Sequence, residues 1–454
     1  MPHGVLFRGG AEGDIRQRII EDDLLDTVIG LGPNLFYGTG IPAAILILRA
    51  KGSKPPERRG KVLFINADRD YREGRAQNHL RPRDEEKITA AYRGFADMDG
   101  FASVVASKTL AQHDFNCNIR RYADNSPPPE PQDVRAHLHG GVPMAEINGA
   151  RDLLDRAGLD VTILFADRGD DYADCCHDVA SARGRESAHA AISCAVSQQA
   201  AANPWRQWWS DQAEPLLHAL PEGSRFVGLR QQLIESFAAH MSETGIDHFE
   251  AAGIAAEWWR DSFHELQTAA SRGWKAVIEG WLTTAEANQD DKNAPDLTDQ
   301  TAIKLLAGPQ LASRAELAAA VASLDAKIKA AEATGDEGDE PDEDGTNPAE
   351  LKRMKSERAK AKKTLKAIDA SLLATVDEAL HEISPAAAPN HAIGEFRSRI
   401  ERLVANQFAE IERDALAWYD NLTNKYGTTL YELEDERDAA SARLVKHLRE
   451  LGYE

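Results

Sequence analysis

Residues 28–42 read VIGLGPNLFYGTGIP, and this stretch decides the fold of the amino-terminal part. Its pattern predicts a strand over 26–29, a turn-rich loop over 32–40, and then a strand over 43–48 that is apolar at every position. A strand that is apolar throughout is typical of burial on both faces of a sheet. The stretch therefore indicates two strands and their connecting loop inside an α/β domain.

Short apolar runs at Val5–Phe7 and Val62–Ile65 predict further strands, and Glu12–Leu25 has the spacing of an amphipathic helix. Residues 1–70 therefore look like the end of a doubly wound sheet and not a whole one. The segment 38–43 also fits the dinucleotide-binding pattern Gly-x-Gly-x-x-Ala. We reject that reading, because Pro42 lies inside the match and a strand follows where the motif needs a helix.

The rest of the chain reads mainly as helix. Asp84–Tyr92 predicts a helix opened by Asp84, Gln132–Ala157 a helix, turn and helix, and Val161–Phe165 an isolated strand. From Tyr172 to Leu306 the pattern is helical. Its tryptophans are interpreted as core anchors in preference to a ligand cage, because large aromatic side chains dominate core burial: Trp205, Trp208, Trp209, Trp258, Trp259, Trp274 and Trp281.

Two stretches repeat apolar residues at steps of three and four, as coiled coils do. The acidic, low-complexity residues 335–346 between them predict a disordered tip, so the two stretches indicate an antiparallel helical hairpin. A last helical region begins near Phe396 and is broken near Gly427. The two seams consist of Leu317, Val321, Leu324 and Ile328, and of Leu351, Met354, Ala361, Leu365, Ile368 and Leu372.

These patterns predict a mixed fold: an incomplete α/β sheet of late strands, followed by a mainly α-helical region with coiled-coil-like helices. The Pro-rich stretch Ser126–Pro131 is the clearest boundary. The predicted parts are the α/β part (1–125), a Pro-rich linker and connector (126–170), a helical domain (171–307), the hairpin with its tip at 335–346 (308–384) and a helical tail (385–454).

Composition limits the class of protein. The chain has 454 residues, of which 42% are apolar and 28% charged, enough for two to four domains. No apolar run approaches the roughly 20 residues of a membrane helix, and no signal-peptide pattern opens the chain. Four cysteines in a chain of this length favour a reducing, cytoplasmic setting.

The formal net charge is −21, whereas a protein that binds DNA alone is usually basic. Two stretches run against this balance. Arg49–Arg93 holds thirteen Lys/Arg and seven Asp/Glu, and Leu351–Asp369 holds eight and two. Each stretch is either a phosphate-facing patch on a subunit whose partner reads the DNA, or an ordinary solvated face.

The Cys175-Cys176-His177-Asp178 run gives no metal prediction. Zinc sites usually space their cysteines two to four residues apart so that both thiolates reach one ion, and adjacent cysteines do this poorly. No catalytic, cofactor-binding or metal residue is therefore assigned from spacing alone.

Five segments carry a family resemblance. Residues 1–10 (MPHGVLFRGG) and 28–42, the Asn118-Ile119-x-Arg121-Tyr122 segment, and the carboxyl-terminal stretches 418–438 and 448–454 resemble the modification (methyltransferase) subunit of type I restriction-modification systems, the N6-adenine DNA methylases. The similarity is strongest over 1–122 and 390–454. It implies that residues 1–125 are the last part of a methyltransferase catalytic domain.

The family's S-adenosylmethionine loop and its catalytic Asn-Pro-Pro-aromatic tetrapeptide lie upstream of these segments. Neither is found here; Asn203-Pro204-Trp205 and Asn347-Pro348-Ala349 are only fragments of the tetrapeptide. We therefore expect the chain to be a split-gene half, a truncation or a remnant that binds no S-adenosylmethionine alone. In the family the 34–42 loop borders the pocket for the flipped adenine, so Phe36, Tyr37 and Thr39 are pocket candidates; a purely structural turn is the alternative.

The resemblance also implies partners. These are the DNA-reading specificity subunit, docked on the terminal helices, the restriction subunit, an upstream methyltransferase half and double-stranded DNA, with no membrane. The first hypothesis is part of an enzyme that methylates adenine N6 with S-adenosylmethionine. The alternatives are a non-catalytic scaffold or degenerate remnant that only binds the specificity subunit and, more weakly, an unrelated coiled-coil protein.

Overall fold

The computed structural model describes residues 1–126, 129–202, 204–222, 226–241, 245–288, 295–334 and 348–453, and the predicted tip 335–346 lies outside them. The chain forms two compact units, each built from separate segments. Unit 1 comprises Met1–Ser210, Arg230–Arg260 and Ile400–Glu454, and unit 2 comprises Asp211–Leu229 and Asp261–Arg399.

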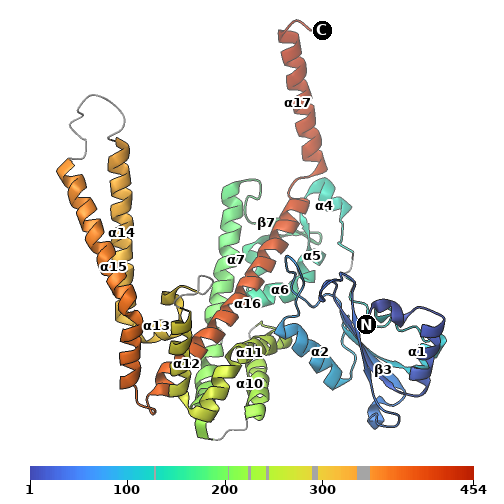
Figure 1. Ribbon diagram of the computed structural model, residues 1–454. Helices are drawn as coiled ribbons and strands as arrows, with labels where there is room; N and C mark the ends of the chain where they lie inside the picture. The colour runs from blue at the N-terminus through green and yellow to red at the C-terminus, as the bar shows by residue number, and fades with distance from the viewer. Residues whose placement is uncertain are drawn as a thin grey trace. The chain divides into compact units, whose positions relative to one another are not determined.

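Unit 1 begins with a four-stranded sheet in the order β2-β1-β3-β4. The central strands β1 and β3 are parallel, with Val28 opposite Phe64, and both outer pairs are antiparallel. The sheet and its helices (Figure 1) are α1 (Ala11–Glu21), β1 (Leu25–Leu31), β2 (Ala44–Leu48), β3 (Lys61–Ala67), α2 (Pro82–Gly94), β4 (Ala102–Ala106) and α3 (Ser107–Gln112).

The central strands form where the sequence predicts them, because their apolar runs fill both faces of the sheet. Every residue of β1 is buried, and so is β3 from Val62 onward. Asp26 on β1 is also fully buried, and its carboxylate is paired with Arg49 at 3.1 Å and Arg58 at 3.0 Å. Two guanidinium partners supply the compensation that a buried carboxylate needs.

Two of the short-strand predictions are wrong. Val5 and Leu6 belong to a 3-10 helix, His3–Leu6, because the chain turns back on itself: Val5 N donates to Pro2 O at 3.3 Å. Val161–Ile163 is likewise a 3-10 turn, and only Phe165 of the predicted strand enters a strand, β6 (Phe165–Gly169). A short apolar run does not distinguish a strand from a single 3-10 turn.

The strand after the loop exists as β2, but the prediction that it is buried on both faces is wrong. It is an outer strand of the sheet, and Ile45 and Leu48 are 47% and 52% exposed. An outer strand has fewer neighbours to cover its side chains than a central one.

A second, small antiparallel sheet follows in unit 1, in the order β5-β7-β6. β7 lies within the region predicted to be helical throughout, so that prediction is wrong for its first residues. Reversal at the Asp170–Asp171 turn, where both residues have positive φ, pairs β6 with β7. The elements are α4 (Val134–His139), β5 (Val142–Pro143), α5 (Met144–Gly149), α6 (Arg151–Ala157), β6 (Phe165–Gly169) and β7 (Tyr172–Cys175).

The helical part of unit 1 packs around tryptophans. The Trp208 ring lies 4.7 Å from Phe237, and the Trp209 ring 6.0 Å from Trp258, both edge-on. Their burial confirms the predicted role as core anchors. The helices that contribute residues to unit 1 are α7 (Ala182–Ala202), α8 (Trp205–Trp208), α10 (Phe226–Met241), α11 (His248–Arg272), α16 (Ala388–Tyr426) and α17 (Leu430–Glu450).

Unit 2 contains the predicted hairpin, formed by α14 and α15 (Figure 1). Arg314 pairs with Asp369 at 2.6 Å and Asp325 with Arg358 at 2.9 Å. The same number of residues separates the two partners on each helix, so the helices run antiparallel in one register. Every predicted seam residue is buried or half-buried. The helices here include α9 (Glu214–His218), α12 (Trp274–Ala287), α13 (Thr301–Leu306), α14 (Gly308–Thr334) and α15 (Pro348–Glu382).

The last helices end as predicted, with a break between α16 and α17 at Gly427. An added Cβ at Gly427 would come 2.2 Å from the Thr423 carbonyl oxygen, so a larger residue would disturb this turn. None of the helices in the described residues combines the length and apolar character needed to span a bilayer.

Candidate functional site

Two loops of unit 1 begin at the same edge of its four-stranded sheet. Because β1 and β3 are parallel, the loop after β1 and the loop after β3 both start at carboxyl ends of strands. Ligands of open α/β sheets bind at this edge. We call residues 32–43 the aromatic loop and residues 68–81 the arginine loop.

The aromatic loop carries all three predicted pocket residues in one turn. Phe36 and Thr39 form an antiparallel bridge, with Thr39 N donating to Phe36 O at 3.4 Å. Gly38 allows the turn, since its φ is 77°. At the tip Phe36 is 49% and Tyr37 94% exposed. The Thr39 hydroxyl accepts from Ile41 N at 3.2 Å, so Thr39 stabilises the loop itself.

The arginine loop is fastened to the aromatic loop by backbone and amide groups. Gln77 Nε2 donates to Leu35 O at 2.7 Å, and Asn78 Nδ2 donates to Pro33 O at 2.9 Å. Asn78 N also donates to Asn34 O at 2.8 Å. The two loops therefore form one surface, although 42 residues separate Gln77 from Leu35 along the chain.

Residues 118–122, which carry part of the family resemblance, pack against β3 and the start of the arginine loop. Ile119 is buried, and the Tyr122 ring lies 4.6 Å from Phe64 on β3. Arg120 Nη2 donates to Asp68 Oδ2 at 2.7 Å, and Asn125 Nδ2 donates to Asp68 Oδ1 at 2.6 Å. These bonds fix the start of the arginine loop.

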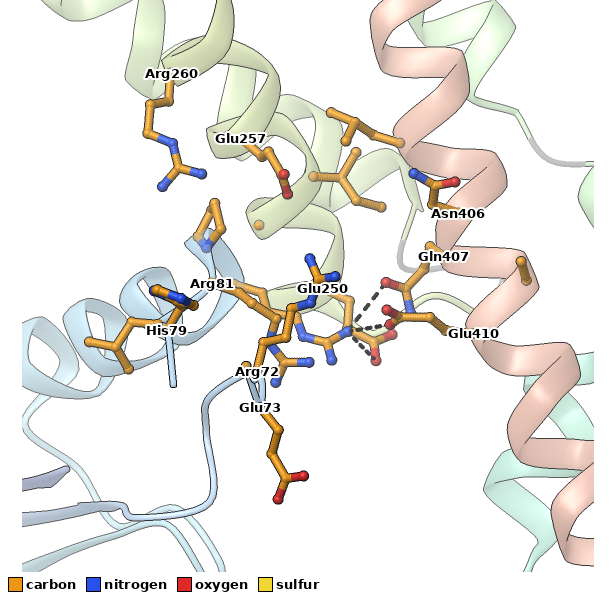
Figure 2. A pocket seen from close by; sticks show the side chains of 18 of the residues that line it. Arg72, Glu73, His79, Arg81, Glu250, Glu257, Arg260, Asn406, Gln407 and Glu410 are labelled. Carbon is orange, nitrogen blue, oxygen red and sulfur yellow. Dashed lines mark hydrogen bonds and ion pairs between the residues drawn. The ribbon is translucent and has the colours of Figure 1, made fainter. Parts of the chain in front are cut away.

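A polar cavity of about 810 Å³ lies beside the arginine loop, also within unit 1 (Figure 2). Figure 2 shows Arg72, His79 and Arg81 entering from the loop, Glu250 and Glu257 from α11, and Gln407 and Glu410 from α16. No sequence motif marks this cavity, because its walls come from segments far apart in the chain.

Arg83 is the centre of the ion-pair network in this cavity. Its Nη1 donates to Glu410 Oε2 at 3.0 Å and Gln407 Oε1 at 3.4 Å, and lies 3.9 Å from Glu250. Arg156 binds both oxygens of Glu250, at 2.9 and 2.7 Å. Burial raises the pKa of Glu250, and Arg156 opposes this shift. The network joins α2, α6, α11 and α16 and is positioned to stabilise them.

The cysteine-histidine run near β7 offers a different environment. Burial raises the pKa of Cys175 to about 11, and Cys176 points to solvent with its Sγ 3.6 Å from Thr162 O. Among the residues that the structure describes, no three His, Cys, Asp or Glu side chains gather as a metal ion would require.

The amino-terminal segment of the chain is similar to known proteins. Residues 1–130 match the N-6 DNA Methylase family model. Over 134 residues the chain is 44% identical to the type I restriction enzyme MjaVIII methylase subunit of Methanocaldococcus jannaschii, covering 29% of this chain and 22% of the relative. The MjaVII methylase subunit of the same organism is 38% identical over 138 residues, covering 30% and 24%.

A solved structure, the type I restriction-modification methyltransferase subunit from Streptococcus thermophilus, is 41% identical, with a TM-score of 0.25, over 27% of this chain and 25% of that one. The chain spans about a quarter of the length of the curated relatives it matches. The family expectation drawn from the strand-loop-strand stretch is confirmed for this segment. Residues 1–130 match the N-6 DNA Methylase family model, and over this segment the chain is similar to type I restriction enzyme methylase subunits.

Proposed function

We propose that this chain is part of a type I DNA methyltransferase that transfers a methyl group from S-adenosylmethionine to adenine N6, and that its aromatic loop borders the pocket for the flipped adenine. The observation that carries the proposal is Tyr37, which is 94% exposed beside Phe36 at the carboxyl edge of the sheet. Aromatic rings in such a position can stack on an extruded base. The loop lies in the segment that matches the N-6 DNA methylase model.

We place neither the cofactor nor the catalytic step on residues described here. S-adenosylmethionine does not fit the ends of β1 and β3, because Asp68, the carboxylate that follows β3, is already bound by Arg120 and Asn125. The loop after β1 offers aromatic rings and a hydroxyl used within its own turn. In the proposal, other residues of the assembled methylase bind the cofactor and react with the adenine amino group.

The proposed partners are the specificity subunit, the restriction subunit and double-stranded DNA, in the cytoplasm. Among the described residues of α17, none is buried. Leu433, Leu444 and Leu448 fall on one face at helical spacing, and all are exposed. Such a face suits another amphipathic helix. It also favours the second candidate function, a non-catalytic scaffold that only binds the specificity subunit.

Replacement of Tyr37 separates these two functions. The protein to test is the assembled complex, with the specificity subunit and any methylase residues that complete the catalytic domain. Stacking of a base on an aromatic ring contributes about 1–3 kcal/mol, so Tyr37→Ala is expected to lower methyl transfer to DNA roughly 5–160-fold. Fluorescence of 2-aminopurine at the target position is expected to fall in parallel, since less of the base is extruded.

Tyr37→Phe is the matched control, because it keeps the ring and removes only the hydroxyl. It is expected to retain methylation and extrusion. Because the side chain is almost fully exposed, neither change should alter the melting temperature. Unchanged methylation in Tyr37→Ala would contradict the adenine-pocket role, and a complex that assembles but transfers no methyl group would favour the scaffold.

A further inference from the structure

The arginine loop presents three arginines at a spacing of three residues. Arg69, Arg72 and Arg75 are all exposed, and none forms a salt bridge within the part of the chain that the structure describes. The chain has 74 acidic against 53 basic side chains, so free carboxylates are abundant elsewhere. Three neighbouring arginines without a salt bridge are therefore available to an external anion, and Arg69 has only a coulombic interaction with Asp124.

The acidic residues of the loop do not cancel this charge. Asp70 forms a salt bridge with Lys87 at 2.9 Å. The Lys87 ammonium also lies 4.1 Å from the centroid of the Phe101 ring. Arg81 forms a salt bridge with Asp84 at 2.9 Å, so this pair adds no net charge to the loop. Glu73 remains as the one acidic side chain between residues 69 and 81 that forms no salt bridge.

The loop is held in shape before any ligand arrives. Arg72 and His79 form an antiparallel bridge, with N–O distances of 2.8 and 3.0 Å, which closes residues 73–78 into a tip. Gly74 has room only for hydrogen, because an added Cβ would lie 2.0 Å from Gln77 O. The tip is bound to the aromatic loop through Gln77 and Asn78. Binding an anion here costs little ordering of the backbone.

We propose that Arg69, Arg72 and Arg75 bind the phosphodiester backbone of double-stranded DNA next to the base that enters the aromatic loop. The proposal rests on the proposed function, because it needs DNA at that loop. Guanidinium groups match phosphate oxygens with paired hydrogen bonds and remain charged at all relevant pH values. Extrusion of a base rotates its backbone, and phosphate contacts fix the register of the duplex on the protein while this happens.

The test is the salt dependence of DNA binding by the assembled complex. The variant Arg69→Gln/Arg72→Gln/Arg75→Gln is compared with Lys352→Gln/Lys360→Gln/Lys363→Gln, which removes the same charge from exposed, unpaired lysines of α15. Affinities for the cognate duplex and an unrelated duplex are measured by fluorescence anisotropy from 50 to 200 mM salt. The slope of log K against log salt is negative, and each lost phosphate contact reduces its magnitude by about 0.9. The magnitude of the slope is therefore expected to fall by about 2–3 in the arginine variant, on both duplexes.

The lysine variant is expected to keep the slope of the unmodified complex. An unchanged slope in the arginine variant, or equal losses in both variants, would overturn the arginine-loop proposal while leaving methylation of DNA, and with it the proposed function, intact. If Tyr37→Ala has no effect on methylation but the arginine variant loses its slope, the adenine-pocket role fails, and of the arginine-loop proposal only the phosphate contacts stand, without their place beside an extruded base. A complex that binds no DNA overturns both.

Discussion

At the residue scale, the four cysteines differ in burial and therefore in how readily their thiols react. Cys117 is buried beneath the sheet, and burial raises its pKa to about 12, while Cys176 and Cys194 are exposed. The nucleophile in alkylation is the thiolate, and at pH 8 only about one Cys117 in ten thousand carries it. We predict that iodoacetamide at pH 8 labels Cys176 and Cys194 first, Cys175 slowly, and Cys117 only after unfolding in urea.

Peptide mass spectrometry over time checks this order. The sign of the pH dependence follows from the raised pKa: labelling of Cys117 in the folded chain stays slow as the pH rises from 7 to 10, because the thiol remains protonated. Rapid labelling of Cys117 in the folded chain would show that the core around Leu6 and Ile119 opens.

Single residues also show what the sequence can and cannot predict. Asp84 marks the start of α2 as expected, although the helix begins two residues earlier, at Pro82, and the Asp84 carboxylate accepts from Arg81 N at 2.8 Å. A capping pattern is local, so it is visible in the sequence. Arg83, the next residue back, gives no such signal, since its partners are set by tertiary packing.

Gly253 decides how two elements meet. An added Cβ there would lie 2.5 Å from Arg83 Cα and 2.7 Å from Arg83 N, so α11 and the start of α2 approach too closely for any side chain. We predict that Gly253→Ala destabilises unit 1 by about 1–3 kcal/mol, as overpacking against backbone does. Urea unfolding followed by circular dichroism measures the loss.

Gly94→Ala is the matched control, because Gly94 ends the same helix α2 and its added Cβ would meet no atom within 4 Å. Its effect on the free energy of unfolding should stay within roughly 0.5 kcal/mol, as for other open surface positions. Equal stability of the Gly253 and Gly94 variants would mean that the α2–α11 contact yields at little cost.

At the scale of elements, the sequence predicts helices and strands that have a clear apolar pattern. It does not predict the position of a strand within the sheet. The hairpin of α14 and α15 follows from its apolar seam, and β1 and β3 follow from their continuous apolar runs. β2 has the same kind of run, but only the strand order shows that it is an outer strand with Ile45 exposed. The aromatic loop was proposed from the family resemblance of residues 28–42, whereas the arginine loop's attachment to it depends on parallel pairing of β1 and β3.

At the scale of the whole molecule, α17 is the element on which the proposed contact with the specificity subunit can be tested. A single helix without buried residues gains little stability from its own sequence, because tertiary packing supplies most helix stability. We predict that Leu444→Asp/Leu448→Asp abolishes binding of the specificity subunit, with at least a hundredfold loss of affinity by calorimetry. The melting temperature of the chain itself should not change.

Ala442→Asp is the control for this prediction. It introduces one of the same charges on α17, but helical spacing places it on the face opposite the leucines. Its affinity for the specificity subunit is expected to match that of the unmodified chain. If Leu444→Asp/Leu448→Asp binds equally well, the specificity subunit does not dock on the leucine face of α17.

The segmented build of unit 1 has a consequence in time. Glu410 follows Arg83 by 327 residues, and unit 2 is encoded between them. At 5–20 residues per second the ribosome needs roughly 16–65 s to cover that distance. For that interval the nascent chain holds the arginine without its α16 partner, so assembly of the cavity is timed by translation and open to chaperones until α16 emerges.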